Sequence, residues 1–393
     1  MAAAVGGRMD GPRLTRPLHG PTKPPMATYD SVVIGGGVMG SAVALRLAQA
    51  GQKVLVLEKA VPGAEASSAA GGILGAQIEG HEDSPTFRLC LASRALYPAL
   101  AEELREATGI DVGFRRCGVL KVAGPSEDFA PLRARAAWQR GLGLAVEELF
   151  GDEARRLEPD LAPDVAFALH FPDDPQVDPR QLARALPLAA QRAGATFRAA
   201  LVRRVLVEDG RATGVQLDGE TIHAGAVVVA AGAWTSLVEG IGLPHEAVRP
   251  VRGQMLRLFL RGLPLRRIVF AARGYVVPRG DGTVITGSTM EDAGFEKKVT
   301  AGGVASILAN ALAAVPALAG AELVESWSGL RPAPADGAPL IGAGAAHGLF
   351  LASGHHRNGI LLTPETARLV AETVLTGREP EALAPFSPRR FAR

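Results

Sequence analysis

Apolar residues occur in two kinds of segment along the chain, and their order predicts a mixed α/β fold. Short, nearly continuous apolar runs at residues 31–34, 224–231 and 349–352 are typical of buried parallel strands. Segments typical of an antiparallel sheet lie between the second and third runs, at residues 254–260, 275–278, 284–286 and 322–329. Helical periods are expected over residues 38–50, 87–107, 129–140, 181–193, 303–314 and 363–375. This order predicts one domain with parallel strands, interrupted by a second domain that is built on an antiparallel sheet.

A glycine turn follows the first apolar run directly. Gly35, Gly37 and Gly40 have the spacing G-x-G-x-x-G, and a helical pattern begins inside the motif. Gly35 allows a tight turn, Gly37 lets backbone N–H groups approach a pyrophosphate, and Gly40 lets the helix pack closely on the strand. The turn therefore predicts a binding site for the phosphates of a dinucleotide.

The residues around this turn extend the prediction to a whole dinucleotide. Val38 and Met39 begin the helix, whose free N–H groups attract phosphate oxygens. A second strand over residues 53–57 leads to Glu58, which can accept hydrogen bonds from a ribose diol. The negative charge of Glu58 argues against a ribose 2′-phosphate. We therefore expect FAD or NAD as the ligand.

Length and composition are those of a two-domain globular enzyme. The chain has 393 residues, of which 47% are hydrophobic and 21% are charged. Its formal net charge is +2; residues 1–26 contribute +3, so the remainder carries −1. No basic face is implied, and nucleic acid is not expected as a partner. Residues 1–26 are rich in Gly and Pro without an apolar period, so we expect them to form a disordered extension.

Three further features limit where the protein acts and what it binds. The apolar run at residues 31–50 has the length of a membrane span, but it contains Arg46 and the glycine turn, so no stable membrane insertion is expected. Cys90 and Cys117 are too few for a disulfide framework or a zinc site, which favours the reducing cytoplasm. The adjacent pair His355–His356 lacks accompanying carboxylate or Cys ligands, so no metal is expected.

Four stretches resemble the FAD-dependent D-amino-acid oxidase superfamily. The first, GGGVMGSAVALRLAQAG at residues 35–51, contains the glycine turn. The other three are similar to glycine oxidases, the flavoenzymes of thiamine biosynthesis: SSAAGGILGAQ at 67–77, WSGLRPAPADGAPLIG at 327–342 and SGHHRNGILLTP at 353–364. The resemblance extends from residue 28 to residue 377. It implies an FAD-binding Rossmann-type (GR2-like) domain with an inserted antiparallel-sheet α+β substrate domain.

The resemblance also implies which residues contact the flavin. In this family a loop of small residues lies against the flavin ring, and only small side chains let the backbone come so close. Both cysteines lie at or before residue 117, which favours noncovalent FAD, because relatives with covalent flavin often use a Cys in the C-terminal half. Beyond the glycine turn and Glu58, the implied contacts are Ser67, Ser68, Ala69, Gly71, Gly72, Ile73, Val202, Gly232, Arg357, Asn358, Gly359 and Ile360.

For the substrate, the family holds the carboxylate of an amino acid with an arginine and a tyrosine. Arg331 in GLRP and Tyr275 in GYVVP match these positions. The role is chemically apt, since a guanidinium group can form two parallel hydrogen bonds with a carboxylate. Arg357 and Met290 match further site residues, with Met290 on the wall of the pocket.

Two positions depart from the pattern of the glycine oxidases. Arg273 stands where close relatives carry a histidine near the pocket mouth, and His356 replaces an aromatic residue. Neither change removes a carboxylate ligand. Both leave the preference among glycine, sarcosine and small D-amino acids open.

The implied activity is oxidation of glycine and other small amines. Hydride would pass from the substrate Cα to the flavin, and oxygen would then be reduced to hydrogen peroxide. The imine would give glyoxylate and ammonia, or supply thiazole synthesis. The sequence lacks an obvious Ser–His or His–Asp pair, which fits a reaction that depends on positioning. The expected partners are a small amino acid, oxygen and further copies of the chain.

Three other functions remain open. A D-amino-acid dehydrogenase of the same fold would pass electrons to a quinone, and a sarcosine oxidase would act on a secondary amine. An FAD-containing module of an RNA-modification protein is disfavoured by the nearly neutral charge of the folded part. The positions of the motifs predict an FAD-binding domain over residues 27–85, 171–248 and 330–393, and a substrate domain over residues 86–170 and 249–329.

Overall fold

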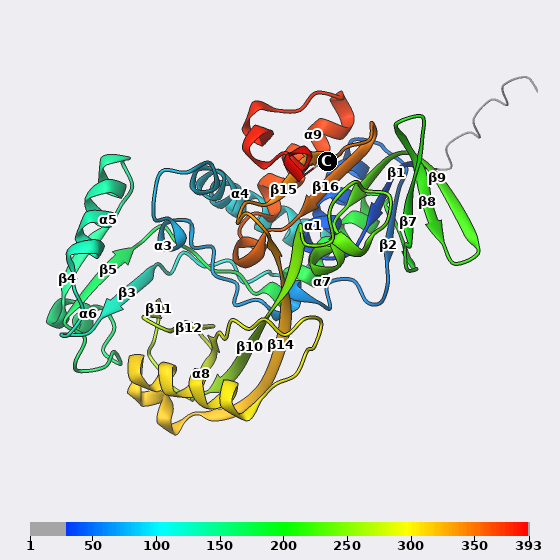
Figure 1. Ribbon diagram of the computed structural model, residues 1–393. Helices are drawn as coiled ribbons and strands as arrows, with labels where there is room; N and C mark the ends of the chain where they lie inside the picture. The colour runs from blue at the N-terminus through cyan, green and yellow to red at the C-terminus, as the bar shows by residue number, and fades with distance from the viewer. Residues whose placement is uncertain (1–28, 392–393) are drawn as a thin grey trace, which may run out of the picture.

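The computed structural model describes residues 29–391, which form two sheets with helices packed on them (Figure 1). In the first sheet the strand order is β15–β16–β9–β1–β2–β6, and the hairpin of β7 and β8 extends from β9. β1, β2, β6, β9 and β16 run parallel, whereas β15 and the hairpin strand β8 are antiparallel to their neighbours. The strands are β1 (Tyr29–Ile34), β2 (Val54–Glu58), β6 (Thr196–Ala199), β7 (Arg204–Glu208), β8 (Arg211–Leu217), β9 (Glu220–Val229), β15 (Leu340–Ala343) and β16 (Leu349–Ser353).

The predicted relation between the first, middle and last apolar runs is confirmed. β1 pairs with β9 and β9 pairs with β16, both in parallel, so strands from the start, middle and end of the chain are neighbours. Alternate residues of β1 enter different cores: Val33 packs with the helices on one face, and Val32 packs beside the β7–β8 hairpin on the other. This burial of both faces explains why the strand is apolar throughout.

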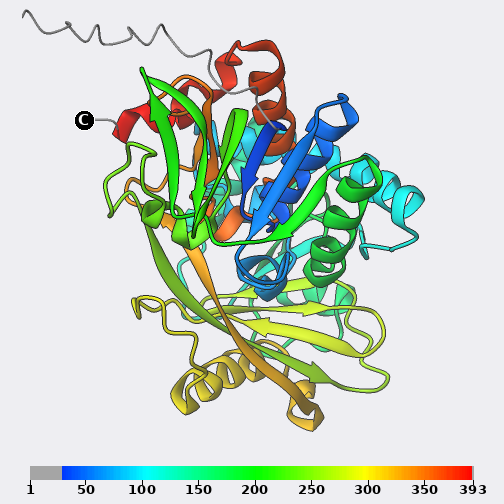
Figure 2. The same ribbon diagram turned by 90° about the vertical axis from the view of Figure 1, so that its right-hand side faces the viewer.

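The second sheet has the order β14–β10–β13–β12–β11–β3–β5–β4. All its neighbours are antiparallel except β11 and β3, so the predicted antiparallel character holds for all but one pair. β10 and β14 are long paired strands that run from beside the first sheet along one edge of the second (Figure 2). The strands are β3 (Val119–Ala123), β4 (Glu147–Phe150), β5 (Phe167–Phe171), β10 (Val248–Phe259), β11 (Ile268–Ala271), β12 (Gly274–Pro278), β13 (Thr283–Gly287) and β14 (Glu322–Pro334).

Helices cover one face of the first sheet and pack on both faces of the second, where Ala136 of α5 and Ile307 of α8 belong to different cores. α1, α4, α7 and α9 pack together on the first sheet, and α8 packs on the second, with Ile307 buried against β10 and β12. Within residues 29–391, every helix is too short or too polar to cross a lipid bilayer. The helices are α1 (Val38–Gln49), α2 (Ala66–Ala69), α3 (Ala76–Glu79), α4 (Pro85–Thr108), α5 (Ala130–Gly141), α6 (Gly151–Leu157), α7 (Pro179–Arg192), α8 (Ala301–Ala314) and α9 (Thr363–Thr376). Short 3₁₀ helices are η1 (Gly232–Leu237), η2 (Pro316–Gly320), η3 (His356–Asn358), η4 (Glu381–Phe386) and η5 (Pro388–Phe391).

One boundary of the predicted domains changes when packing is considered. We placed residues 86–170 in the substrate domain, but α4 shares its core with α1, α7 and α9, with Tyr97 fully buried there. We therefore propose that α4 belongs to the FAD-binding domain, and keep the other boundaries as proposed divisions. The extension predicted for residues 1–26 lies outside the described residues.

Candidate active site

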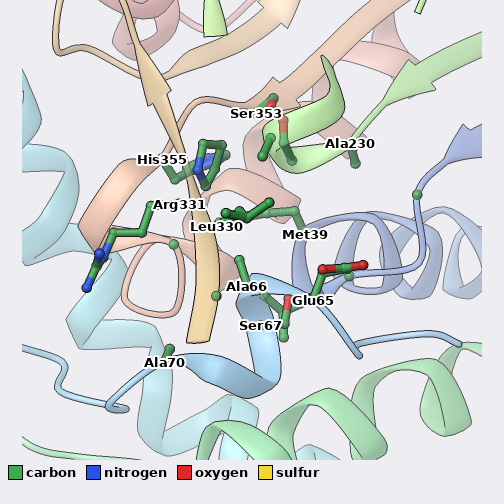
Figure 3. A pocket seen from close by; sticks show the side chains of 18 of the residues that line it. Met39, Glu65, Ala66, Ser67, Ala70, Ala230, Leu330, Arg331, Ser353 and His355 are labelled. Carbon is green, nitrogen blue, oxygen red and sulfur yellow. Dashed lines mark hydrogen bonds between the residues drawn. The ribbon is translucent and has the colours of Figure 1, made fainter. Parts of the chain in front are cut away.

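A cavity of about 570 Å³ lies between the glycine turn of the first sheet and strands β10 and β14 of the second. Figure 3 shows Met39 of α1, Ser67 of α2, Arg331 of β14 and His355 around it. One end is lined by Glu58 at the end of β2. The other end is lined by side chains of the second sheet. This volume lies in the range of about 300–1,000 Å³ that is usual for small-molecule and cofactor sites.

The glycine turn has no room for larger residues. Gly35 has φ +102°, and a Cβ atom there would lie 2.5 Å from the carbonyl oxygen of Ala230. A Cβ atom on Gly40 would lie 1.9 Å from the carbonyl oxygen of Gly35. Gly35 therefore permits the turn, and Gly40 permits α1 to pack on it without lining the cavity.

The start of α1 and the end of β2 supply the polar groups at this end. α1 begins after Gly37 with no side-chain cap and no acidic residue in its first turn, so its N-terminus is electrostatically open to an anion. The N–H of Val38 donates to Ser67 Oγ at 3.1 Å. Glu58 accepts from the N–H of Gly36 through Oε2 at 2.8 Å, which fixes its carboxylate at the cavity wall. These features fit the pyrophosphate and ribose of a dinucleotide.

The small-residue loop is held in place from the second sheet. Trp327 Nε1 donates to the carbonyl of Ala69 at 3.1 Å, and Arg279 Nη2 donates to the carbonyl of Gly71 at 2.8 Å. Gly72 has φ +80°, and a Cβ atom there would lie 2.1 Å from the carbonyl oxygen of Val177. The loop therefore presents backbone and small side chains to the cavity in one defined position, as a flat ring requires.

Arg331 is a largely buried, positively charged residue that lines the opposite end of the cavity. Its Nη2 donates to Ser288 Oγ at 2.7 Å and its Nη1 to the carbonyl of Thr289 at 3.2 Å, so both partners are neutral groups. Burial lowers the pKa of Arg331 from its ordinary value, but a guanidinium group stays charged in proteins. A Cβ atom on Gly253 would lie 2.1 Å from Arg331 Nη1, so only glycine leaves room for this side chain.

Tyr275 lies beside the small-residue loop and faces the same end. A Cβ atom on Gly71 would be 3.2 Å from the Tyr275 hydroxyl, and this hydroxyl donates to Met255 Sδ at 3.3 Å. The Tyr275 side chain is also close enough to Arg331 to raise its pKa, partly opposing the effect of burial. The tyrosine hydroxyl and the guanidinium group therefore lie together where a carboxylate could contact both.

Arg357 and His356 form the rim of this end. Arg357 Nη2 lies 2.8 Å from Glu79 Oε1, so its charge is already balanced. His356 has φ +47°, an unusual backbone conformation for a histidine. Burial, followed by the positive charges of Arg331, Arg357 and Arg249, lowers the pKa of His356 to about 4. His356 is therefore neutral near pH 7.

His355, the neighbour of His356, points into the protein. It is 4% exposed, and its Nε2 lies 3.1 Å from Thr366 Oγ1 in α9. Burial lowers its pKa to about 3. His355 is therefore a neutral wall residue that ties the last motif to α9.

The structure brings most of the predicted site residues to this cavity. Three do not line it: Gly40 packs behind the turn, Ser68 faces a different cavity, and Met290 is 57% exposed. Met290 follows β13, where its side chain points to the surface, so its assignment to the pocket wall is wrong. The predicted residues that line the cavity are Gly35, Gly37, Val38, Met39, Glu58, Ser67, Ala69, Gly71, Gly72, Ile73, Val202, Gly232, Tyr275, Arg331, Arg357, Asn358, Gly359 and Ile360.

Sequence reasoning missed several residues at the Arg331 end. Glu79, Gly253, Met255, Phe270 and Ser288 line the cavity but belong to no motif that we recognised. Gly253 is the one for which a signal existed, because an isolated glycine within a strand pattern indicates the close approach of another group.

Comparisons with known proteins agree with this geometry. A family model described as FAD dependent oxidoreductase (DAO) matches residues 30–373. The glycine oxidase of Geobacillus kaustophilus is 42% identical over 366 residues, which are 92% of this chain and 97% of that protein. The bifunctional protein ThiO/ThiG of Trichormus variabilis is 36% identical over 93% of this chain and 56% of its own length.

The solved structures give the same result for the fold. The crystal structure of glycine oxidase from Geobacillus kaustophilus has a TM-score of 0.87 at 41% identity, and the match covers 92% of this chain and 98% of that one. The cavity, the glycine turn and the open helix N-terminus suit the FAD of such proteins. The chain belongs to the FAD-dependent oxidoreductase (DAO) family, alongside the glycine oxidases, and is an FAD-dependent amino-acid oxidase.

Proposed function

We propose that this protein oxidises glycine and other small amines, including sarcosine and small D-amino acids. The observation that supports this most strongly is the position of Arg331, a buried guanidinium group with only neutral partners, at the opposite end of the cavity from Glu58. Such a group lacks a counter-ion that a substrate carboxylate would supply. Noncovalent FAD when bound would accept hydride from the substrate Cα and pass the electrons to oxygen, yielding an imine and hydrogen peroxide.

The side chains around Arg331 would position the substrate. Arg331 would hold the carboxylate through two hydrogen bonds, and the Tyr275 hydroxyl would exchange its weak contact with Met255 Sδ for one with the same carboxylate. Because His356 is neutral, it adds no second positive charge that would compete with Arg331 for the substrate carboxylate. Positioning the Cα in this way would supply much of the rate, since no acid or base is needed at the carbon.

The fate of the products is part of the same proposal. Water would convert the imine from glycine to glyoxylate and ammonia. The similarity to a bifunctional ThiO/ThiG protein supports a second outcome, in which the imine supplies thiazole synthesis for thiamine. We further propose that the protein acts in the cytoplasm as a homo-oligomer, with oxygen as the electron acceptor.

Substitution of Arg331 tests the proposal. Arg331→Ala should reduce kcat/KM for glycine by about 30- to 1000-fold, or roughly 2–4 kcal/mol, with normal flavin content. Arg331→Lys should restore only part of the loss, because it lacks the planar fork. Tyr275→Phe should reduce the stabilisation of the transition state, measured from kcat/KM for glycine, by only about 1 kcal/mol, since one hydrogen bond is lost. Oxygen uptake at saturating oxygen measures all three, and Arg261→Ala, an exposed arginine outside the cavity, is the control. Near-normal kcat/KM in Arg331→Ala would show that the substrate binds elsewhere.

The electron acceptor needs a separate measurement. An oxidase mixed with glycine should show bleaching of the flavin followed by rapid return of colour in air. Rapid bleaching with slow return of colour would instead identify a dehydrogenase that uses a quinone.

A further inference from the structure

A second cavity, of about 390 Å³, lies against the small-residue loop and is lined by Ser68 and Ala70. Ala70 lines both cavities, so this loop forms a wall that they share. The other walls come from the start of α7, from strands β10, β13 and β14, and from the turn between β12 and β13. The site has no part in the proposed oxidation and goes beyond it.

Four arginines line the second cavity: Arg180, Arg184, Arg257 and Arg279. The carboxylates nearby are already engaged. Asp178 caps α7 by accepting from the N–H groups of Arg180 and Gln181, and Asp281 accepts from the N–H of Thr283 at 2.8 Å. Glu325, which pairs with Arg180 and Arg257, is a third carboxylate nearby, so four guanidinium groups face three carboxylates and the positive charge is in excess by one.

Two of the arginines have few partners of their own. Arg180 forms a two-bond pair with Glu325, which leaves Arg257 with a longer contact of 3.5 Å to the same carboxylate. Among residues 29–391, no hydrogen-bond partner is found for the buried Nε of Arg257. Arg184 is exposed and has a 3.3 Å hydrogen bond to the Gln181 side chain. Arg184 and Arg257 thus have donor capacity for an anionic ligand.

We propose that this cavity binds a small phosphate monoester. Guanidinium groups form paired hydrogen bonds with phosphate oxygens, and Arg184 of α7 and Arg257 of β10 could bind one phosphate group from different elements. The volume exceeds what a single phosphate fills and lies within the range of small-molecule sites. Ile285, Pro179 and the ring of Trp327 give an apolar surface for the organic part.

A ligand in this cavity should alter the surroundings of the flavin, because two side chains of the cavity wall also hold the small-residue loop. The Arg180 guanidinium lies 4.7 Å from the centre of the Trp327 ring, and Trp327 donates to the carbonyl of Ala69. Arg279, another wall residue, donates to the carbonyl of Gly71. A ligand that moves either side chain changes the position of the loop that faces the flavin. Flavin absorbance is therefore a readout that does not depend on catalysis.

Calorimetric titration of the yellow holoenzyme at constant ionic strength tests the proposal, with glycerol 2-phosphate, inorganic phosphate and glycerol as probes. The monoester should bind at one site per chain, more tightly than inorganic phosphate, and should shift the flavin spectrum. Glycerol should not bind. Arg257→Gln and Arg184→Gln should each weaken the monoester by about 10-fold, because each loses a charge-assisted contact. Arg105→Gln, a surface change on α4, should bind like the wild type.

Because Arg257 is partly buried, its variant needs a check of folding by flavin content. Arg184→Glu supplies an independent test, since Arg184 is exposed and its reversal should not disturb the fold. This variant should lose monoester binding while it retains full flavin. Three results would overturn the proposal: no binding to the wild type, equal binding to Arg184→Glu, or equal affinity for the monoester and inorganic phosphate. None of these depends on whether glycine is the substrate.

Discussion

The two ends of the large cavity are built from different parts of the polypeptide. At the FAD end the walls around the glycine turn are mostly backbone and small residues of β1, α1, β2 and α2, which follow one another between residues 29 and 69, and residues 200–203, 230–234 and 237–239 complete this end. At the substrate end the walls are the side chains of Glu79, Tyr275, Arg331 and Arg357, which come from four elements spread over most of the chain. Local geometry determines the glycine turn of the first end, whereas long-range packing determines the second end as a whole.

This difference sets what each end tolerates. Where a ligand meets backbone, the critical property is the absence of a side chain, so one added methyl group is damaging. Where it meets charged side chains, the critical property is their support by neighbouring groups, since a buried charge without a partner is costly. Substitutions chosen for each end should therefore fail in different ways.

The largest effect is expected from a buried charge that supports the substrate end. Asp174 is fully buried, lies 2.6 Å from Arg94, and accepts from the N–H groups of Gln77 and Ile78 at the start of α3, the helix that carries Glu79. Asp174→Asn would leave Arg94 without its counter-ion, at a cost of about 3–5 kcal/mol in the free energy of unfolding. Urea denaturation measures this cost.

A surface pair provides the control for Asp174. Asp83→Asn removes an exposed partner of Arg88 and should leave the melting temperature nearly unchanged. Equal effects of the two substitutions would show that burial does not distinguish these pairs.

At the FAD end, Gly40→Ala should have the next largest effect. The new Cβ atom would lie 1.9 Å from the carbonyl oxygen of Gly35, and backbone must move to relieve the overlap. We expect a loss of about 3 kcal/mol in stability and purification with little flavin. Gly141→Ala, where no atom lies within 4 Å of the added Cβ, should retain full flavin. Full flavin content in Gly40→Ala would contradict the close packing of α1 on the turn.

Gly253→Ala applies the same chemical change to the substrate end. Its Cβ atom would overlap the guanidinium group of Arg331, the mobile end of a side chain, so Arg331 should shift rather than the fold. We expect normal flavin content with kcat/KM for glycine lowered by about 10- to 100-fold. Gly302→Ala, which has open space around its Cβ, is the control. Loss of flavin in Gly253→Ala would remove the distinction between the two ends.

The smallest effect concerns the pH dependence of stability. The pKa of His355 is about 3 in the folded protein and about 6.5 when unfolded, so the unfolded chain binds the extra proton between these values. His355 should therefore lower the free energy of unfolding by about 1.4 kcal/mol for each pH unit as pH falls from 6.5 towards 3. Urea denaturation at pH 7, 6 and 5 should give a flatter dependence for His355→Gln. An unchanged slope would mean that folding does not lower the pKa of His355.

The same contrast explains how much could be predicted from the sequence. The roles of Gly35, Gly40 and Glu58 follow from neighbours within 30 residues, so a local pattern was enough to predict them. Three parallel strands were also predicted correctly, because burial on both faces leaves a continuous apolar run. β4, β5, β11 and β15 were missed because each has only four or five residues, and β11 also depends on a partner, β3, that lies about 150 residues away.

The substrate end could be predicted only where a family resemblance supplied it. Arg331 and Tyr275 were assigned by resemblance, and the structure brings them to one end of the cavity. Met290 was assigned in the same way, but a motif does not specify the direction of a side chain beyond the end of a strand. Glu79 was missed because its partner, Arg357, is 278 residues away.

The parallel pairing of β9 with β16 has a consequence for synthesis on the ribosome. β1 and β2 emerge early, but β16 of the same sheet and the wall residues at positions 353–360 are translated more than 290 residues later. Domains tend to fold as units during translation, yet here the first and last strands belong to the same sheet. FAD can therefore be enclosed only after residue 360 has left the ribosome, so the emerging chain must remain soluble without its cofactor until then.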